Sequence, residues 1–164
     1  MVAAFTGDPV LRFMFPEDGD YPRQAAAFFG YLFDKRVGRG SIFTVEGGVS
    51  AAIWEPPGGA DVVAEELDLP PGARERVQRY DDAIHAAFPS ESYWYLGVLG
   101  THPAAAGRRL GRAVMAEGLR RAAADGLPAY LETSKPANVD LYRRAGWEVV
   151  AEVTDPLPTW VMRH

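Results

Sequence analysis

The segment His102–Met115 holds residues that could bind a phosphate group, because two glycines and three arginines follow directly after the apolar run YWYLGVLG. The pattern predicts a strand followed closely by a helix. The first amides of a helix have no partner within it, and its peptide dipoles leave partial positive charge there, so a helix start attracts anions. Arginines there could bind a pyrophosphate, although arginines on a helix can equally form a solvated face. The residues concerned are Gly107, Arg108, Arg109, Leu110, Gly111 and Arg112.

A second group of chemically capable side chains lies in the segment ETSKPANVDLYRRAGW. Glu132 lies near the end of a predicted strand, PAYLET, and a short helix is predicted from about Asn138 to Ala145. Tyr142 follows Asn138 by four residues, which places both side chains on one side of that helix. The spacing therefore predicts that Asn138 and Tyr142 face the same site.

The first half of the chain predicts elements that would frame such a site. An apolar three-and-four spacing predicts a helix that Asp20 caps and that ends at about Gly38. The runs SIFTVE and VSAAIW predict strands joined by a two-residue turn at Gly47-Gly48, because glycines supply the positive φ that such turns require. Pro70–Phe88 predicts a helix that is charged on one side. These elements give one hairpin between two helices.

The second half predicts a sheet with further helices. YWYLGVLGT is nearly all apolar, which is typical of a strand covered on both faces. A helix is predicted from about Gly107 to Asp125, and the runs WEVVAEVT and PTWVMRH predict two closing strands. The order of elements predicts a mixed α/β (α+β) fold with a sheet flanked by helices.

Length and composition exclude several classes of protein. With 164 residues, 48% of them hydrophobic, the chain predicts a single domain, 1–164. The absence of cysteine excludes disulfides and thiolate metal sites, and the three scattered histidines predict no metal site. A net charge of −5 argues against nucleic-acid binding. Without a membrane-spanning or export segment, we expect no membrane partner and a cytoplasmic location.

These motifs resemble those of the GNAT superfamily of N-acetyltransferases, and within it the puromycin N-acetyltransferase-like branch. LGVLGTHPAAAGRRLG is similar to the family's Q/R-x-x-G-x-G/A cofactor turn, and ETSKPANVDLYRRAGW to its N-x-x-x-Y-E-R-x-G-F segment. The runs DPVLRFMFP, AAIWEPP and TWVMR extend the likeness over nearly the whole chain. The resemblance implies a three-layer fold with a central mixed, largely antiparallel sheet. It also implies acetyl transfer from acetyl-CoA, without a metal, to a primary amine of a small molecule.

The resemblance assigns the cofactor contacts. The turn from Gly107 to Arg112 would hold the pyrophosphate, and Asn138 would contact the pantetheine or orient the loop. The thioester carbonyl would meet main-chain amides of the strand, at Leu99, Gly100 and Thr101. A glycine inside an apolar strand fits a bulge or a close backbone approach, and equally packing beneath an aromatic ring.

The resemblance also assigns catalytic roles. Tyr142 would donate a proton to the departing thiolate, since a tyrosine, with a pKa of about 10, is protonated at neutral pH. Glu132 would deprotonate the amine, directly or through water. Packing for Tyr142 and a structural ion pair for Glu132 are the competing interpretations. Other candidates for the base are Glu91, Tyr93, Tyr95 and His85, whereas His102 is expected to be only exposed.

Three departures from the family pattern stand out. Ala106 stands where the turn usually has Gln or Arg, and Arg109 stands where it usually has Gly. A glycine-like conformation at Arg109 would be strained. Only MVAAFTG precedes the run DPVLRFMFP, so the start is either short or its sheet edge is completed by another segment; a homodimer that covers the gap is one hypothesis.

Substrate recognition is assigned to the first helix, the loop after Trp54 and the segment 61–88. Phe13, Phe15, Trp54 and Tyr80 are predicted as aromatic lining or core, and Asp81 and Asp82 as a cation-attracting pair or a solvated face. The likeness to antibiotic acetyltransferases makes a small amine plausible as acceptor. Alternatives are a non-catalytic acyl-CoA or ligand sensor and a protein N-terminal or lysine acetyltransferase. A dinucleotide-dependent oxidoreductase would need G-x-G-x-x-G, which is not the spacing found.

Overall fold

The computed structural model describes residues 1–59 and 63–164. Five α-helices and six strands carry the fold in these residues. The helices are α1 (Pro9–Met14), α2 (Tyr21–Val37), α3 (Pro71–His85), α4 (Leu110–Ala124) and α5 (Pro136–Arg143). The strands are β1 (Ile42–Val45), β2 (Ser50–Glu55), β3 (Trp94–Thr101), β4 (Ala129–Thr133), β5 (Glu148–Val153) and β6 (Thr159–Arg163). Four short 3₁₀ segments lie between them, at Val2–Phe5, Glu46–Gly48, Ala64–Glu66 and Pro103–Ala105.

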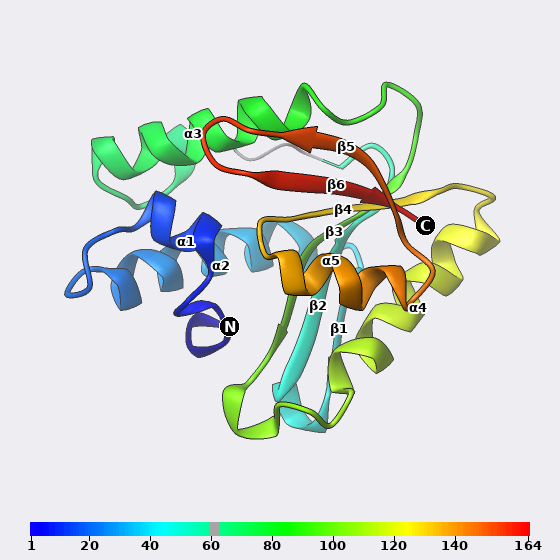
Figure 1. The fold of residues 1–164 in the computed structure, drawn as a ribbon. Coiled ribbons are helices and arrows are strands. Elements are labelled where there is room, and N and C mark those ends of the chain that lie inside the picture. The colour runs from blue at the N-terminus through cyan, green and yellow to red at the C-terminus, as the bar shows by residue number, and fades with distance from the viewer. Residues whose placement is uncertain (60–62) are drawn as a thin grey trace.

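The strands form one mixed sheet in the order β1-β2-β3-β4-β6-β5. All neighbours are antiparallel except β3 and β4, which run parallel and pair only at Trp94 with Ala129 and at Tyr95 with Tyr130. Beyond these two pairs the strands separate, and Figure 1 shows β3 running away from β4 toward the lower end of the molecule. The parallel pair therefore opens a gap in the middle of the sheet.

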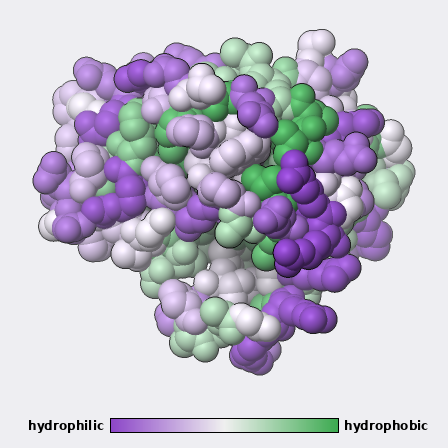
Figure 2. Space-filling model, viewed as in Figure 1, coloured by the Kyte–Doolittle hydropathy of each residue, from purple (hydrophilic) through white to green (hydrophobic). Residues whose placement is uncertain are grey.

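Helices cover both faces of the sheet, which gives three layers (Figure 1). One core joins α1, α2 and α3 to one face through Ile53 and Val98. The other joins α4 and α5 to the opposite face, where the indole of Trp54 is fully buried. A Cβ at Gly118 of α4 would lie only 2.0 Å from that indole, so this glycine allows helix and sheet to pack closely. Figure 2 shows the α5 side as a mainly hydrophilic surface with small hydrophobic patches.

The predicted elements and the mixed α/β fold are confirmed, with local corrections. The hairpin loop is four residues long rather than two, since Val45 pairs with Ser50 across it. Asp20 precedes α2 but its side chain does not cap the helix; it accepts a hydrogen bond from Arg23 at 3.2 Å instead. The helix predicted from Gly107 begins at Leu110, because Arg109 adopts a left-handed conformation with φ 61° that a helix cannot include.

The first residues form helical turns that the sequence pattern did not predict. Asp8 caps α1 by accepting hydrogen bonds from the amides of Val10 (3.0 Å) and Leu11 (3.2 Å). Its second carboxylate oxygen lies 3.5 Å from the ammonium of Lys135, after β4. Residues Val2–Phe5 pack against α2 and β3 rather than adding a strand, and β1 is an edge of the sheet. Within the described residues, no helix is long and apolar enough to cross a membrane.

Candidate active site

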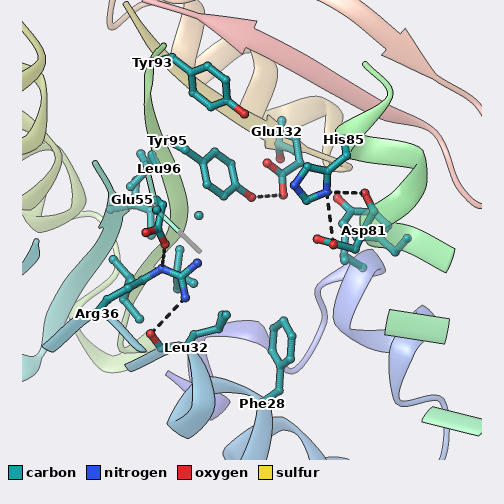
Figure 3. Close-up of a pocket in the computed structure, with 18 of the residues that line it drawn as sticks. Phe28, Leu32, Arg36, Glu55, Asp81, His85, Tyr93, Tyr95, Leu96 and Glu132 are labelled. Atoms are coloured by element: carbon teal, nitrogen blue, oxygen red, sulfur yellow. Dashed lines mark hydrogen bonds and ion pairs between the residues drawn. The ribbon is translucent and has the colours of Figure 1, made fainter. Parts of the chain in front are cut away.

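A cavity of about 420 Å³ opens where β3 and β4 separate. Its walls come from α1, α2, α3, α5 and the central strands, so it receives side chains from most of the chain. Figure 3 shows charged side chains on opposite sides of the cavity, with Phe28 and Leu32 along one edge between them. Among its lining residues are Phe28, Arg36, Glu55, Tyr80, Asp81, His85, Tyr95, Glu132, Asn138 and Tyr142.

Glu132 is the most perturbed carboxylate of the cavity. Its Oε1 accepts a hydrogen bond from the hydroxyl of Tyr95 at 2.9 Å, while its Oε2 is buried without a hydrogen-bond partner (Figure 3). Burial disfavours the charged form and raises the pKa of Glu132 to about 7, against the smaller opposing effect of the Tyr95 hydrogen bond. A carboxyl with such a pKa can accept or release a proton near neutral pH.

Tyr142 lines the same cavity from α5. Its ring packs edge-on against Trp147, with ring centroids 6.0 Å apart, and its side chain is 8% exposed. Burial, and then the charge of Glu132, raise the pKa of Tyr142, so its hydroxyl stays protonated at neutral pH. That hydroxyl has no hydrogen bond to any described residue, which leaves it available as a proton donor.

The α3 side of the cavity adds a carboxylate and an imidazole. The Nδ1 of His85 lies 3.2 Å from the Asp81 carboxylate and 3.0 Å from the Asp81 carbonyl oxygen (Figure 3). Tyr80, one residue earlier, is 6% exposed, and burial followed by the charge of Glu132 raises its pKa well above the usual value. The helix predicted from Pro70 therefore directs Tyr80, Asp81 and His85 toward the site.

An ion pair lies at the α2 end of the cavity. The Nε of Arg36 meets Oε2 of Glu55, at the end of β2, and its Nη1 donates to the carbonyl oxygen of Leu32 at 3.3 Å (Figure 3). The Nη1 of Arg39 contacts Oε1 of the same carboxylate at 3.1 Å. Only 8% of the Arg36 side chain is exposed, so this guanidinium is a buried cation inside the cavity wall.

The glycine-arginine turn has the backbone of an anion site. Gly107 has φ 82° and Arg109 φ 61°, so the turn takes the glycine-like conformation at Arg109 that carries strain. The amides of Arg109, Leu110 and Gly111 have no hydrogen-bond partner among the described residues. These amides and the start of α4 could therefore hold a pyrophosphate, and the residues present fit acetyl-CoA as ligand.

The three arginines of the turn differ in their surroundings. Arg108 forms a two-fold contact with Glu46 in the hairpin loop, with Nη1–Oε2 2.9 Å and Nη2–Oε1 2.7 Å. Arg109 and Arg112 are exposed, and their guanidinium groups make no ion pair with a described residue. Arg109 and Arg112 are thus the arginines available to a phosphate, whereas Arg108 would first have to leave Glu46.

The bulge of β3 lies at Gly97 rather than at Gly100. Leu96 pairs with Trp54 and Val98 with Ile53, so Gly97 has no opposite residue on β2. Gly100 keeps regular pairing, and a Cβ there would lie 2.7 Å from the sulfur of Met1 and 2.9 Å from the Phe5 ring. These contacts match the packing interpretation of Gly100. Both glycines look alike in the sequence, and only the pairing with β2 distinguishes them.

The remaining residues assigned to the cofactor also have defined positions. Leu99 lines the cavity, and the hydroxyl of Thr101 lies 2.8 Å from that of Ser50. The side-chain amide of Asn138 donates to the Thr133 hydroxyl at 3.2 Å, so Asn138 orients the loop after β4 while it lines the cavity. Asn138 and Tyr142 do face one site, as their spacing predicts.

The aromatic lining differs from the expectation. Phe15 and Trp54 are fully buried core residues, and Phe13 packs at the edge of the α1–α3 core without lining the cavity. Tyr80 lines the cavity as predicted, and the other aromatic lining residues are Phe5, Phe28, Phe29, Tyr93, Tyr95 and Tyr142. Asp82 points away from the cavity and accepts a hydrogen bond from Gln78, because residues 81 and 82 lie about 100° apart on a helix.

Several residues of the site were not assigned roles from the sequence. Tyr95 is assigned only as an alternative base, and Arg36 and Glu55 are assigned no role. Arg36 does carry a local signal, because it follows Leu32 by four residues and so lies on the apolar side of the predicted helix. Its contact with Glu55 joins α2 to β2, and the sequence does not show it. Alternation along β3 could have placed Tyr95 beside Tyr130 if the parallel pairing had been known. Among the described residues, no group of three or more His, Asp or Glu side chains could hold a metal ion.

Comparison with known proteins agrees with this geometry. Residues 73–147 match the model of the acetyltransferase (GNAT) family, a range that includes most of α3 and all of β3, the turn, α4, β4 and α5. The chain has the GNAT fold. The matched range contains both Glu132 and Tyr142.

Solved structures of the same fold cover nearly the whole chain. A protein described as histone acetyltransferase HPA2 and related acetyltransferase, from Corynebacterium glutamicum, is 22% identical with a TM-score of 0.66, over 99% of this chain and 84% of that one. The C-terminal condensation domain of Ebony, in complex with beta-alanyl-dopamine, is 15% identical with a TM-score of 0.68, over 99% of this chain and 89% of that one. Drosophila melanogaster polyamine N-acetyltransferase is 16% identical with a TM-score of 0.54, over 97% of this chain and 87% of that one. At these identities the likeness shows the GNAT fold.

Proposed function

We propose that this protein transfers an acetyl group from acetyl-CoA to a primary amine of a small molecule, by direct attack within a ternary complex. The observation that carries the proposal is the meeting of Glu132 and Tyr142 in one cavity at the point where β3 and β4 separate. One group has a pKa suited to taking a proton, and the other has a hydroxyl that stays protonated.

Acetyl-CoA, when bound, supplies the activated thioester. The unpaired amides at the start of α4 and the guanidinium groups of Arg109 and Arg112 are suited to its pyrophosphate. The gap between β3 and β4 is suited to an extended pantetheine arm, with Leu99 and Asn138 beside it. These contacts would bring the thioester to Tyr142 without occupying the acceptor side near Glu132.

In the reaction, Glu132 takes the proton that the amine loses as the new carbon–nitrogen bond forms. The carbon–sulfur bond breaks, and Tyr142 donates its proton to the departing sulfur. Tyr95 keeps the Glu132 carboxylate in place by donating to Oε1, which directs Oε2 toward the incoming amine. Oε2 of Glu132 and the Tyr142 side chain are buried, so both proton transfers take place where charges are weakly screened.

The cavity favours small amines as acceptors. Its volume of about 420 Å³ suits a compact molecule, and its carboxylates, Glu132 and Asp81, suit a cationic group. The polyamine N-acetyltransferase of the same fold, by its name, also uses an amine. Assignment to the puromycin N-acetyltransferase-like branch stays a prediction.

The proposal is tested by calorimetric titration with acetyl-CoA, followed by a thiol-release assay over a panel of amines that includes arylalkylamines, polyamines and a lysine-containing peptide. Saturable binding with thiol release on small amines is the expected result. Thiol release on the peptide alone would instead indicate a protein acetyltransferase. Binding without release on any amine would indicate a sensor, and absence of binding would contradict the cofactor site.

A further inference from the structure

Two polar groups with unengaged atoms face each other across the cavity, and together they indicate which chemical groups an acceptor molecule carries. At one end, Oε2 of Glu132 is buried and lacks a hydrogen-bond donor. At the other, Arg36 uses Nε for Glu55 and Nη1 for the Leu32 carbonyl, while its Nη2 has no partner among the described residues. Buried polar groups in proteins are normally satisfied, so Oε2 of Glu132 calls for a hydrogen-bond donor. The unengaged edge of the Arg36 guanidinium can donate to an anionic group of the same ligand.

The Arg36 end carries excess positive charge. Arg36 and Arg39 both contact the single carboxylate of Glu55, so two cations share one anion. Arg36 is also held firmly, because Leu32, one turn earlier on α2, and Glu55, at the end of β2, fix two sides of its guanidinium. A fixed guanidinium with one free edge prefers a carboxylate or a similar anionic oxygen group.

The wall between the two ends is apolar and partly aromatic. Figure 3 shows Phe28, Leu32, Leu96 and the ring of Tyr95 around the space that separates Arg36 from Glu132. Phe28 and Leu32 are buried at 8% and 6% exposure, and they form part of the core next to α1 and α3. Such a wall suits a hydrocarbon or aromatic body rather than a polar chain.

We propose that the acceptor is an amine that carries a carboxylate or similar anionic group at its opposite end, bound by Arg36. This inference rests on the proposed function for the role of the amine end. Arg36 acts in substrate binding and specificity and takes no part in the proton transfers. The cavity thereby distinguishes a bifunctional aromatic amine from a simple arylalkylamine or a polyamine, whose other end is neutral or cationic.

The test compares two amines that differ only at the far end. 4-(2-Aminoethyl)benzoate carries the carboxylate, and 2-phenylethylamine lacks it. A hydrogen bond to a charged group contributes about 1.5 kcal/mol or more, and about 1.4 kcal/mol corresponds to a factor of ten. We therefore expect kcat/KM to be about tenfold higher for the benzoate. Calorimetric titration of both compounds, without acetyl-CoA, measures the same preference independently of turnover.

Variants of Arg36 and its partner assign the preference to this site. Arg36→Met leaves Glu55 paired with Arg39, and it should reduce the preference for the benzoate to about one or below. Glu55→Gln keeps an oxygen for Arg36 but removes the competing charge, and it should increase the preference. Arg23→Met, the same substitution at an exposed position near the start of α2, should leave it unchanged.

The outcomes separate this inference from the proposed function. Binding of the benzoate that depends on Arg36, without thiol release from any amine, would support the anion site and contradict the acetyltransferase. Thiol release with equal kcat/KM for the two amines would support the acetyltransferase and overturn the anion site. Failure of the benzoate to bind, or a preference that survives Arg36→Met, would also overturn it.

Discussion

The cofactor turn and the acceptor cavity are built in opposite ways. The turn uses consecutive residues, from His102 to Arg112, and its arginine side chains are exposed to water. The cavity draws Arg36, Glu55, Tyr95 and Glu132 from α2, β2, β3 and β4, and these side chains are buried or half-buried. The cofactor turn is therefore formed by a local backbone conformation, whereas the acceptor cavity forms only when distant parts of the chain pack together.

This difference decides how strongly each region can act on a ligand. In the cavity, burial raises the pKa of Glu132 to about 7, which makes its proton affinity sensitive to every neighbour. Around the turn, solvent and salt screen each charge, so individual contacts contribute little and several must combine. We expect substitutions in the cavity to affect turnover strongly and substitutions in the turn to affect cofactor affinity moderately.

The largest effect is expected for Glu132→Gln, which keeps the shape of the side chain but removes the base. General base catalysis typically contributes a factor of 10² to 10⁴, so kcat/KM should fall at least about 100-fold. This fall in kcat/KM is measured by thiol release at pH 8. A fall of less than about fivefold would assign the proton transfer to another group, with His85 the first alternative.

The stability of the same variant provides its control. The folded-state pKa of Glu132 lies above its usual 4.5, so the folded protein binds a proton more tightly than the unfolded chain. The protonated Glu132 side chain therefore contributes to the free energy of unfolding below about pH 4.5. This contribution is lost as pH rises from about 4.5 to about 7, and the loss persists above pH 7. Glu132→Gln should therefore be more stable than the parent at pH 8, by up to about 3 kcal/mol, by denaturant unfolding. A large loss of activity in such a stabilised variant cannot come from unfolding.

The next largest effect is expected for Tyr142→Phe. Because the Tyr142 hydroxyl makes no hydrogen bond to a described residue, its removal should leave thermal stability nearly unchanged. Turnover should fall by roughly 10- to 100-fold, since the proton donor to sulfur is lost, while the Kd of acetyl-CoA stays the same. Trp147→Phe, which changes the ring packed on Tyr142, should mainly lower stability. Unchanged turnover in Tyr142→Phe would remove it from the mechanism.

A smaller effect is expected for Arg112→Glu in the cofactor turn. Reversing this exposed charge should weaken acetyl-CoA binding about tenfold but leave binding of acetyl-pantetheine, which lacks the pyrophosphate, nearly unchanged. Arg120→Glu makes the same change near the other end of α4, where the guanidinium pairs with Glu117, and it serves as the control. Equal losses for both ligands would indicate that Arg112 is structural. Raised salt should reduce the difference in acetyl-CoA affinity between Arg112→Glu and the parent protein.

The smallest effect concerns the backbone at Arg109. A left-handed conformation costs a non-glycine residue about 1 kcal/mol, whereas glycine adopts it freely. Arg109→Gly should therefore be more stable than Arg109→Ala by up to about 1 kcal/mol, less what the greater freedom of glycine costs in the unfolded chain. Both variants lose the charge, so the comparison isolates the backbone. Equal stability would mean that the turn changes conformation in the alanine variant.

The sequence predicted the elements well because hydrophobic periodicity is a local property. Each predicted helix from Asp20 onward and each predicted strand is present, and the resemblance directed attention to Glu132 and Tyr142, which do line one cavity. The predicted start of α4 is three residues too early, because hydrophobic periodicity does not show that Arg109 leaves helical geometry; only the family's glycine at this position points to it. The local information thus determined the layers but not the detail of their ends.

The parts that could not be predicted depend on contacts between distant residues. Whether Gly97 or Gly100 forms the bulge depends on the register of β2, some 45 residues earlier in the chain. The contact between Tyr95 and Glu132 arises from the parallel pairing of two strands. Arg36 follows Leu32 by four residues, so its spacing places it on the buried face of α2, but its ion pair with Glu55 on β2 is visible only in the fold. Chemistry that relies on burial therefore became visible only with the fold.

The most direct test of the account is the pH dependence of thiol release by the parent protein, divided by that of Glu132→Gln with the same amine. Division cancels the ionisation of the amine itself. Since Glu132 must be ionised to act as the base, the ratio should rise with pH, with a midpoint near 7, and then level off. When the Tyr95→Phe variant replaces the parent protein in this ratio, the midpoint should move to higher pH, because the Tyr95 hydrogen bond lowers the pKa of Glu132. A ratio that stays flat from pH 5.5 to 9 would contradict the assignment of Glu132 as the base, and with it the central claim about this site.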